Sequence, residues 1–295
     1  MASAAPAHDN PNRAWRNDPS AAVGALLLAP ALILLFLFFV LPILRIFWVA
    51  LSEPTFGLEN FTAFFASPAA RRSLLTTLRV SAVVTVLATL IGLVVAWELR
   101  TTTSRWKRAA LWLATLFPLW TSVVVRNYAF TILLQRKGIL NTTLISTGFI
   151  DEPLDILYTD VAVILGMLYT MLPYAILPIY ASLVNLDTAI VSAAESLGAS
   201  RFRAVRDVVL PLIAPSVFAA AAITFVVSVG FYITPILLGG PESPFLATFI
   251  DQQLFSLYNF PAAAATASIL FLTAAIVVGF AWRIVGFEQI RKALS

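Results

Sequence analysis

The chain alternates between long apolar runs and short polar segments, a pattern that predicts an all-α membrane protein. A helix needs about 20 mainly apolar residues to cross the hydrocarbon layer of a bilayer. Six runs meet this requirement, so we expect six transmembrane helices. They are Ala21–Leu44, Leu74–Trp97, Ala109–Leu134, Val161–Leu183, Leu212–Leu238 and Ala262–Trp282. The first run is too long for the core of a signal peptide, and we interpret it as a retained span.

Composition supports this class and excludes several kinds of chemistry. Hydrophobic residues make up 60% of the chain and charged residues 12%, so a soluble domain would have too few polar residues to cover its surface. Cysteine is absent and His8 is the only histidine. Disulfides, histidine-based metal sites and catalytic triads built on histidine are therefore excluded. The basic residues form no patch interleaved with aromatic residues, so nucleic acid is not an expected partner.

The distribution of lysine and arginine predicts the orientation, because cytoplasmic flanks retain positive charge. One set of flanks carries four such residues, Arg71, Arg72, Arg136 and Lys137. The other set carries twelve: Arg13, Arg16, Arg100, Arg105, Lys107, Arg108, Arg201, Arg203, Arg206, Arg283, Arg291 and Lys292. We therefore expect both termini to be cytoplasmic, with polar tails at residues 1–20 and 288–295 and a membrane domain at residues 21–287.

The segment Asp187–Pro215 is an unusually polar interruption between two apolar runs. Its pattern predicts two short helices, the first capped by Asp187 and ended by Gly198, the second capped by Ser200. Pro211 then marks the start of the next apolar helix. Small residues and flanking arginines allow this segment to approach a partner closely. An amphipathic helix held at the membrane surface by anionic lipid is the alternative interpretation.

The same segment carries a family resemblance. Its text S-A-A-x3-G-x9-V-x-L-P resembles the E-A-A-x3-G-x9-I-x-L-P loop of permease subunits of ATP-binding-cassette (ABC) importers, with Ser192 in place of the glutamate. The resemblance implies the type I importer permease fold and a pair of cytoplasmic coupling helices at residues 187–211 that dock on an ATPase. The residues we assign to this coupling loop are Ser192, Ala193, Ala194, Glu195, Gly198, Arg201, Arg203, Leu210 and Pro211.

Two further stretches resemble the spermidine/putrescine-type branch of these permeases, namely Pro118–Asn141 and Gly230–Gly240. This resemblance implies a multi-pass protein of the bacterial inner membrane that pairs with a second, similar permease. Two ABC ATPase subunits and a periplasmic solute-binding protein would complete the complex. The implied cargo is a polyamine, or a related solute such as an opine or an amino-acid derivative.

Nucleotide chemistry is assigned to another chain. The sequence contains no G-x-x-x-x-G-K-[ST] loop to bind nucleotide phosphates. We therefore expect a non-catalytic subunit without a cofactor of its own, whose partner ATPase binds ATP and Mg²⁺.

One intramembrane arginine and several aromatic residues are candidates for lining the translocation path. Arg126 lies within the third apolar run, where an unpaired charge is costly. Its side chain can form an ion pair or bind backbone carbonyl groups in the interior of the bundle, an arrangement we call a carbonyl clamp. Alternatively, it can line or gate the translocation path, or extend to the membrane surface. Aromatic faces attract ammonium groups, although each also suits ordinary packing. The candidate path residues are Trp120, Arg126, Tyr128, Tyr169, Tyr174 and Tyr232.

Two other functional classes remain open from the residues alone. A secondary transporter or channel that works by itself requires paired carboxylates within its spans, and the apolar runs contain none. A membrane scaffold without a transport role is the third class.

Overall fold

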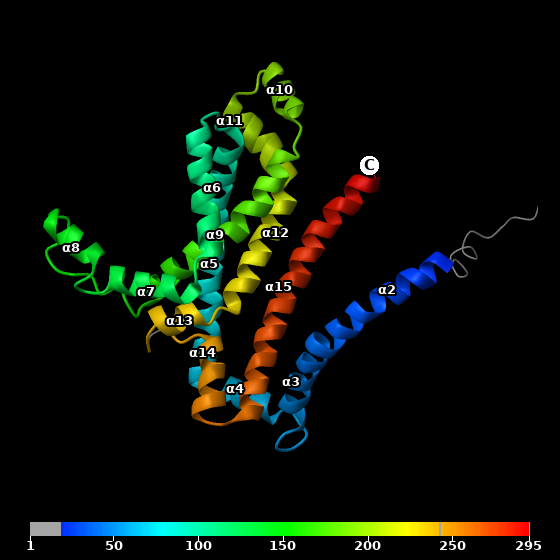
Figure 1. Cartoon of the computed structure of the whole chain (residues 1–295), viewed down its shortest axis with the longest axis vertical. Helices are drawn as coiled ribbons and strands as arrows, with labels where there is room; N and C mark the ends of the chain where they lie inside the picture. The colour runs from blue at the N-terminus through cyan, green and yellow to red at the C-terminus, as the bar shows by residue number, and fades with distance from the viewer. Residues whose placement is uncertain (1–18, 242, 295) are drawn as a thin grey trace, which may run out of the picture.

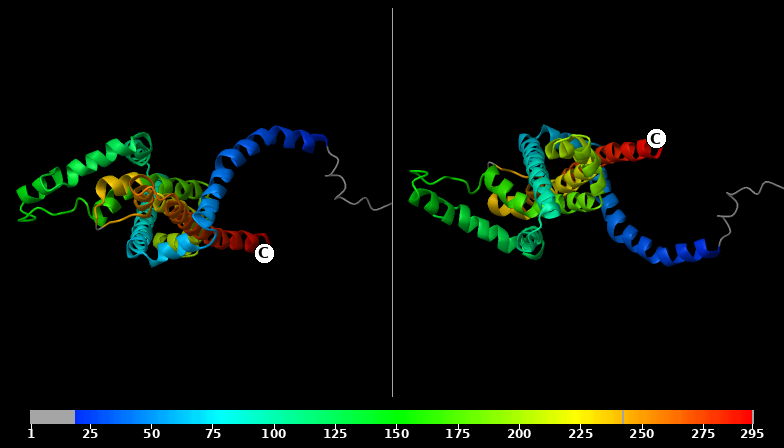
Figure 2. Two further views of the ribbon diagram at one scale, coloured as in Figure 1. Left: turned by 90° about the horizontal axis from the view of Figure 1, so that it is seen from below. Right: turned by 90° about the horizontal axis from the view of Figure 1, so that it is seen from above.

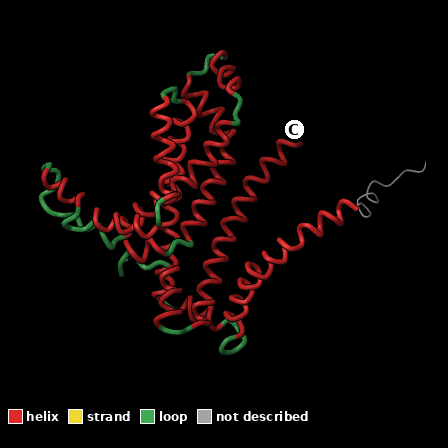
Figure 3. Tube along the Cα trace, viewed as in Figure 1, coloured by secondary structure: helices red, strands yellow, loops and turns green. Residues whose placement is uncertain are grey.

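The computed structural model describes residues 19–241 and 243–294, and all regular secondary structure in these ranges is helical (Figure 3). The all-α class is thus confirmed, whereas the predicted N-terminal tail lies almost wholly outside the described residues. The elements are α2 (Pro19–Leu35), η1 (Phe36–Val40), α3 (Leu41–Ser52), α4 (Glu59–Ala66), α5 (Pro68–Thr101), α6 (Arg105–Trp120), α7 (Val123–Leu134), α8 (Ile139–Ser146), α9 (Asp160–Val184), α10 (Thr188–Ser196), α11 (Arg201–Ala204), η2 (Val205–Val209), α12 (Leu210–Val229), α13 (Ile233–Leu238), α14 (Leu246–Asp251), η3 (Gln252–Ser256) and α15 (Phe260–Leu294).

Five described helices are long and apolar enough to cross a membrane, and the number is six if one bent pair of helices counts as a single span. The bent pair corrects the prediction of one helix over Ala109–Leu134. The segments Arg105–Trp120 and Val123–Ser146 meet at 109°. Pro118 lacks the N–H of a regular helical residue, and α6 ends two residues later at Trp120, followed by an extended Thr121.

The fifth predicted span, Leu212–Leu238, is also interrupted. Helix α12 ends at Val229, and α13 begins after a break of three residues. Gly230 caps α12, and Pro235 in the first turn of α13 has no N–H to continue the earlier helix. The apolar run therefore extends beyond the helix that crosses the bundle.

Helices α5, α9 and α12 form the centre of the bundle (Figure 1). Small residues allow α5 and α9 to approach closely, because a Cβ placed on Gly92 would lie 3.0 Å from the Cβ of Ala175. One buried cluster includes Val84 and Met171, and a second, nearer α10, includes Leu99 and Ile179. The bundle therefore has a packed core along its length.

Two arms leave this bundle in opposite directions (Figures 1 and 2). The first is the N-terminal span Leu27–Ser52, whose most apolar stretch is 0% buried. Only its α3 end packs against α15, where the rings of Phe47 and Phe271 meet edge to face at 5.7 Å. The second arm consists of α7 and α8. Both arms leave apolar surface that the described residues do not cover.

Candidate functional site

Helix α10 stands at one end of the molecule, beyond the ends of α5 and α6 (Figure 1). Its N-terminus is capped by Asp187, whose Oδ1 accepts a hydrogen bond from the N–H of Ala189 at 2.8 Å. Its C-terminus is a Schellman motif: the N–H of Gly198 donates to Glu195 O, and that of Ala199 donates to Ala194 O. Gly198 has φ +89°, which explains the glycine there. The predicted caps are confirmed.

The apolar residues of α10 are directed mainly outward. Leu197 is 89% exposed, Ile190 is 39% exposed, and Ser192, Ala193 and Glu195 are exposed as well. Val191, in contrast, packs against the buried cluster that contains Leu99. The face that carries Ile190, Ala193 and Leu197 is therefore not the one that packs on the described part of the chain. It lies at the tip of the elbow, the unit formed by α10 and the start of the helix that begins at Arg201.

The second predicted short helix is not a separate element. Helix α11, the π-helical turn η2 and α12 run without a break from Arg201 to Val229, so Pro211 lies inside the fifth-span helix. The wider turn η2 ends two residues before Pro211. Because Pro211 has no N–H, the carbonyl oxygen four residues earlier would lack its donor in a regular α-helix. Ser200 caps this helix through the N–H of Arg203 at 3.4 Å. The elbow is thus joined rigidly to a membrane span.

Of the remaining coupling residues, Arg203 and Pro211 are exposed, Leu210 is half-buried and Ala194 is half-buried. The side chain of Arg201 lies outside the described part of the structure. On the other side of the elbow, Arg100 at the end of α5 donates to Leu186 O at 3.0 Å. The turn before α10 is therefore anchored to the central helix of the bundle.

Arg126 lies at the bend between α6 and α7. It is 7% exposed, and its Nη1 donates a hydrogen bond to Pro118 O at 3.1 Å. Its guanidinium carbon also lies 5.5 Å from the centre of the Tyr169 ring on α9. The geometry is that of the carbonyl clamp. Both residues line a hollow of about 310 Å³ that also includes Phe117 and Phe130.

The other path candidates do not converge on this hollow. Trp120 is 83% exposed, Tyr128 is 57% exposed, and Tyr174 lies at the edge of the bundle at 36%. Tyr232 is partly buried and donates its hydroxyl hydrogen to Asp251 Oδ1 at 3.0 Å. Among the described candidates, the structure places the ring of Tyr169 against the guanidinium of Arg126.

A polar network at the end opposite α10 was missing from the sequence interpretation. Asp160, in the first turn of α9, accepts hydrogen bonds from Arg79 of α5 and Ser243 of the α13–α14 loop. The hydroxyl oxygen of Thr77 accepts a bond from the N–H of Leu246 at 2.7 Å. Arg79 and Asp160 are 81 positions apart in the chain, and Asp160 and Ser243 are 83 positions apart. No local sequence pattern predicts contacts over such separations.

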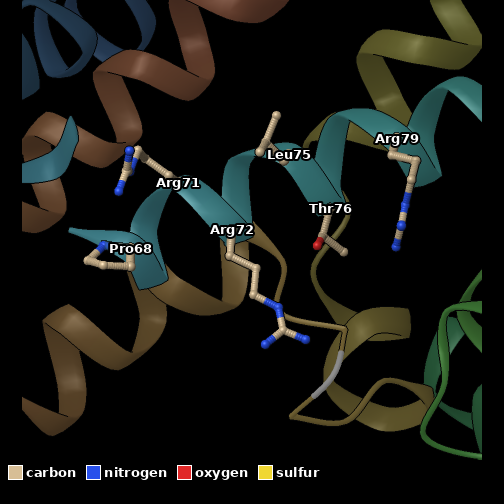
Figure 4. Close-up of a pocket in the computed structure, with 6 residues that line it drawn as sticks. All are labelled: Pro68, Arg71, Arg72, Leu75, Thr76 and Arg79. Atoms are coloured by element: carbon tan, nitrogen blue, oxygen red, sulfur yellow. The ribbon is translucent and has the colours of Figure 1, made fainter. Parts of the chain in front are cut away.

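The same end carries a hollow of about 450 Å³ along the first turns of α5 (Figure 4). Arg72 and Arg79 point to one side of the helix in this view, with Thr76 between them, while Arg71 points away. Three arginines line this hollow and Asp160 pairs with one of them, so the lining is basic and does not favour a polyammonium ligand.

The helical fold and the elbow are typical of a membrane transport subunit, and comparison with known protein families identifies the family. Residues 20–285 match the family described as binding-protein-dependent transport system inner membrane component, and the chain belongs to it. It is an ABC importer permease, and its relatives place it in the spermidine/putrescine branch. The match includes the first span and leaves out only the ends of the chain.

Comparison with individual proteins shows which members of the family the chain is similar to. The chain is 32% identical over 221 residues to the spermidine/putrescine transport system permease protein PotB of Haemophilus influenzae, covering 75% of this chain and 77% of that protein. The Escherichia coli protein of the same name is 30% identical over 228 residues, covering 77% and 82%. These names confirm the predicted branch and the multi-pass location in the inner membrane.

Solved structures show the same fold at lower identity. A bacterial ABC transporter involved in the import of the acidic polysaccharide alginate superposes with a TM-score of 0.79 at 20% identity, over 92% of this chain and 98% of that one. A methionine ABC transporter in an inward-facing conformation gives 0.56 at 20% identity, over 72% and 93%. The predicted type I importer permease fold is thereby confirmed.

Proposed function

We propose that this chain is the permease subunit of an ATP-driven importer of a polyamine or a related organic solute, such as an opine or an amino-acid derivative. The observation that carries the substrate class is its similarity to two permeases named for spermidine and putrescine. The chain itself is non-catalytic in this proposal. ATP and Mg²⁺ are bound by two ABC ATPase subunits on the cytoplasmic side.

The elbow formed by α10 and the start of the fifth-span helix supports docking of an ATPase. Its exposed surface is built from Ser192, Ala193 and Leu197, and small side chains allow a partner groove to approach the backbone. The elbow connects to α5 through Arg100 and continues directly into α12. A displacement of α10 by the ATPase would therefore move the bundle as well.

The first span supports pairing with a second permease. Its stretch within Leu27–Ser52 contacts so little of its own chain that it is 0% buried. A translocation path between two permeases also explains why Trp120 and Tyr128 are exposed on this subunit. Alternating access would then shift two packed subunits relative to each other.

Substrate selection is assigned to a periplasmic binding protein that delivers the cargo. Calorimetric titration of that protein with putrescine, spermidine, opines and amino acids tests the substrate class, and we expect the two polyamines to bind. If only opines or amino acids bind, the polyamine assignment is wrong while the importer assignment stands.

A secondary transporter that works alone is the competing function. Among the described residues, no aspartate or glutamate is fully buried, so the usual coupling carboxylate has no candidate there. Uptake in proteoliposomes separates the two functions. We expect uptake only when the second permease, the ATPase, the binding protein and ATP are present, and uptake by this chain alone would contradict the proposal.

A further inference from the structure

Two hollows lie side by side where α5 ends and the fifth-span helix begins, just below α10. Trp97, Leu183 and Val205 line both of them. The first has a volume of about 430 Å³ and the second about 350 Å³. These three shared lining residues make the two hollows adjacent.

The first hollow is apolar and opens on the flank of the bundle. Its rim carries Val94, which is 67% exposed, and Phe202, which is 73% exposed. Its remaining lining residues are also hydrophobic: Leu93, Leu210 and Ile213. Its lining comes from α5, α9 and the fifth-span helix, which are all long and apolar enough to cross a membrane, so we expect its opening to face lipid tails. An acyl chain matches this surface in chemistry and in access.

The second hollow lies under α10 and carries charges of both signs. Arg100 supplies a guanidinium, held in place by its bond to Leu186 O at 3.0 Å. Asp187 and Glu195 supply carboxylates to the same hollow. Trp97 stands between the two hollows, the position at the membrane surface where tryptophan is enriched. The polar hollow therefore suits a headgroup with both an anionic and a cationic group.

We propose that a diacyl phospholipid with a phosphoethanolamine headgroup occupies both hollows. Its phosphate faces Arg100, its primary ammonium faces Glu195 and Asp187, and one acyl chain fills the apolar hollow. A phosphocholine headgroup has no N–H to donate to the carboxylates, and a phosphoglycerol headgroup has no cation. The bound lipid is wedged between α5 and the elbow, so it holds α10 at its position relative to the bundle.

Native mass spectrometry of the importer complex tests the proposal. The complex is delipidated and exchanged into mixed micelles that contain equal amounts of phosphatidylethanolamine, phosphatidylcholine and phosphatidylglycerol. We expect retained phosphatidylethanolamine to exceed phosphatidylcholine by about tenfold, as one charge-assisted hydrogen bond predicts. Equal retention of the three lipids overturns the proposal.

Two tryptophan variants on α5 locate the site. Val94→Trp fills the apolar hollow, whereas Val86→Trp places the same side chain at a position that is 56% exposed and does not line either hollow. We expect Val94→Trp to lose the retained lipid and Val86→Trp to keep it. Retention by Val94→Trp at the wild-type level overturns the assignment of the acyl chain.

Glu195→Gln tests the headgroup at a surface position that does not threaten folding. We expect the preference for phosphatidylethanolamine over phosphatidylcholine to fall at least threefold while total retained lipid changes little. Soluble phosphoethanolamine is added in a parallel sample to separate a lipid from a free headgroup. Displacement of the lipid by millimolar phosphoethanolamine, or an unchanged preference in Glu195→Gln, contradicts the proposal.

Discussion

The Nη1 of Arg126 donates a hydrogen bond to the carbonyl oxygen of Pro118 at 3.1 Å, across the bend between α6 and α7. Carbonyls in the last turn of a helix have no intrahelical donor, and in a membrane no bulk water replaces it. Arg126 supplies that donor from the next helix and also contacts the Tyr169 ring. One buried cation therefore stabilises both the end of α6 and the sharp turn after it.

Replacing Arg126 with methionine should loosen this bend. Loss of a buried hydrogen bond from a charged group costs about 1.5–3 kcal/mol. Because the chain has no cysteine, spin labels introduced at Leu113 and Ile132, both exposed, report on the angle between α6 and α7. We expect a broader distance distribution and slower uptake. Arg136→Met, at an exposed ion pair with Asp155, is the control and should leave both unchanged.

Gly198→Val should weaken coupling between ATP hydrolysis and uptake while insertion remains normal. The left-handed backbone there disfavours a β-branched residue, although no atom lies within 4 Å of a Cβ at this position. Gly148→Val is a matched control, because Gly148 also has positive φ and open surroundings. ATPase activity and uptake are measured together for both variants. Normal uptake by Gly198→Val would rule out the docking role of the elbow.

Asp160→Asn should loosen the end of the molecule opposite α10 more than Arg79→Gln does. Asp160 joins α9 to both Arg79 and Ser243, whereas the Arg79 side chain is 64% exposed and its ion pair is screened by solvent. Pairs exposed to this extent contribute at most about 1 kcal/mol. Thermal unfolding in detergent should show the larger decrease in melting temperature for Asp160→Asn. Equal decreases in melting temperature for the two variants would show that the hydrogen bond between Asp160 and Ser243 does not contribute to stability.

Single cysteines test the predicted orientation. Ser196→Cys on α10 and Thr147→Cys beyond α8 are both exposed positions in an otherwise cysteine-free chain. A thiol reagent that does not cross membranes should label Thr147→Cys in intact spheroplasts, and Ser196→Cys only after the membrane is opened. The opposite pattern would invert the topology.

Local signals in the sequence anticipated the elbow well and the bends poorly. Asp187, Gly198 and Ser200 act within a few residues of their own positions, so capping preferences located them. Pro118 and Pro235 lie within two of the predicted spans, but proline occurs both in kinked helices and at helix ends. Whether a span continues after the proline depends on a distant donor such as Arg126, which the local pattern does not contain.

The apolar runs by themselves determined that this chain is an all-α membrane protein, because burial in hydrocarbon requires long helices whatever their neighbours are. The spacing around Gly198 likewise determined the elbow and its family. Tertiary structure alone decided which face of α10 is exposed, where the third span breaks, and that Asp160 joins Arg79 to Ser243. These features depend on contacts between residues far apart in the chain, and such contacts exist only after the helices have packed.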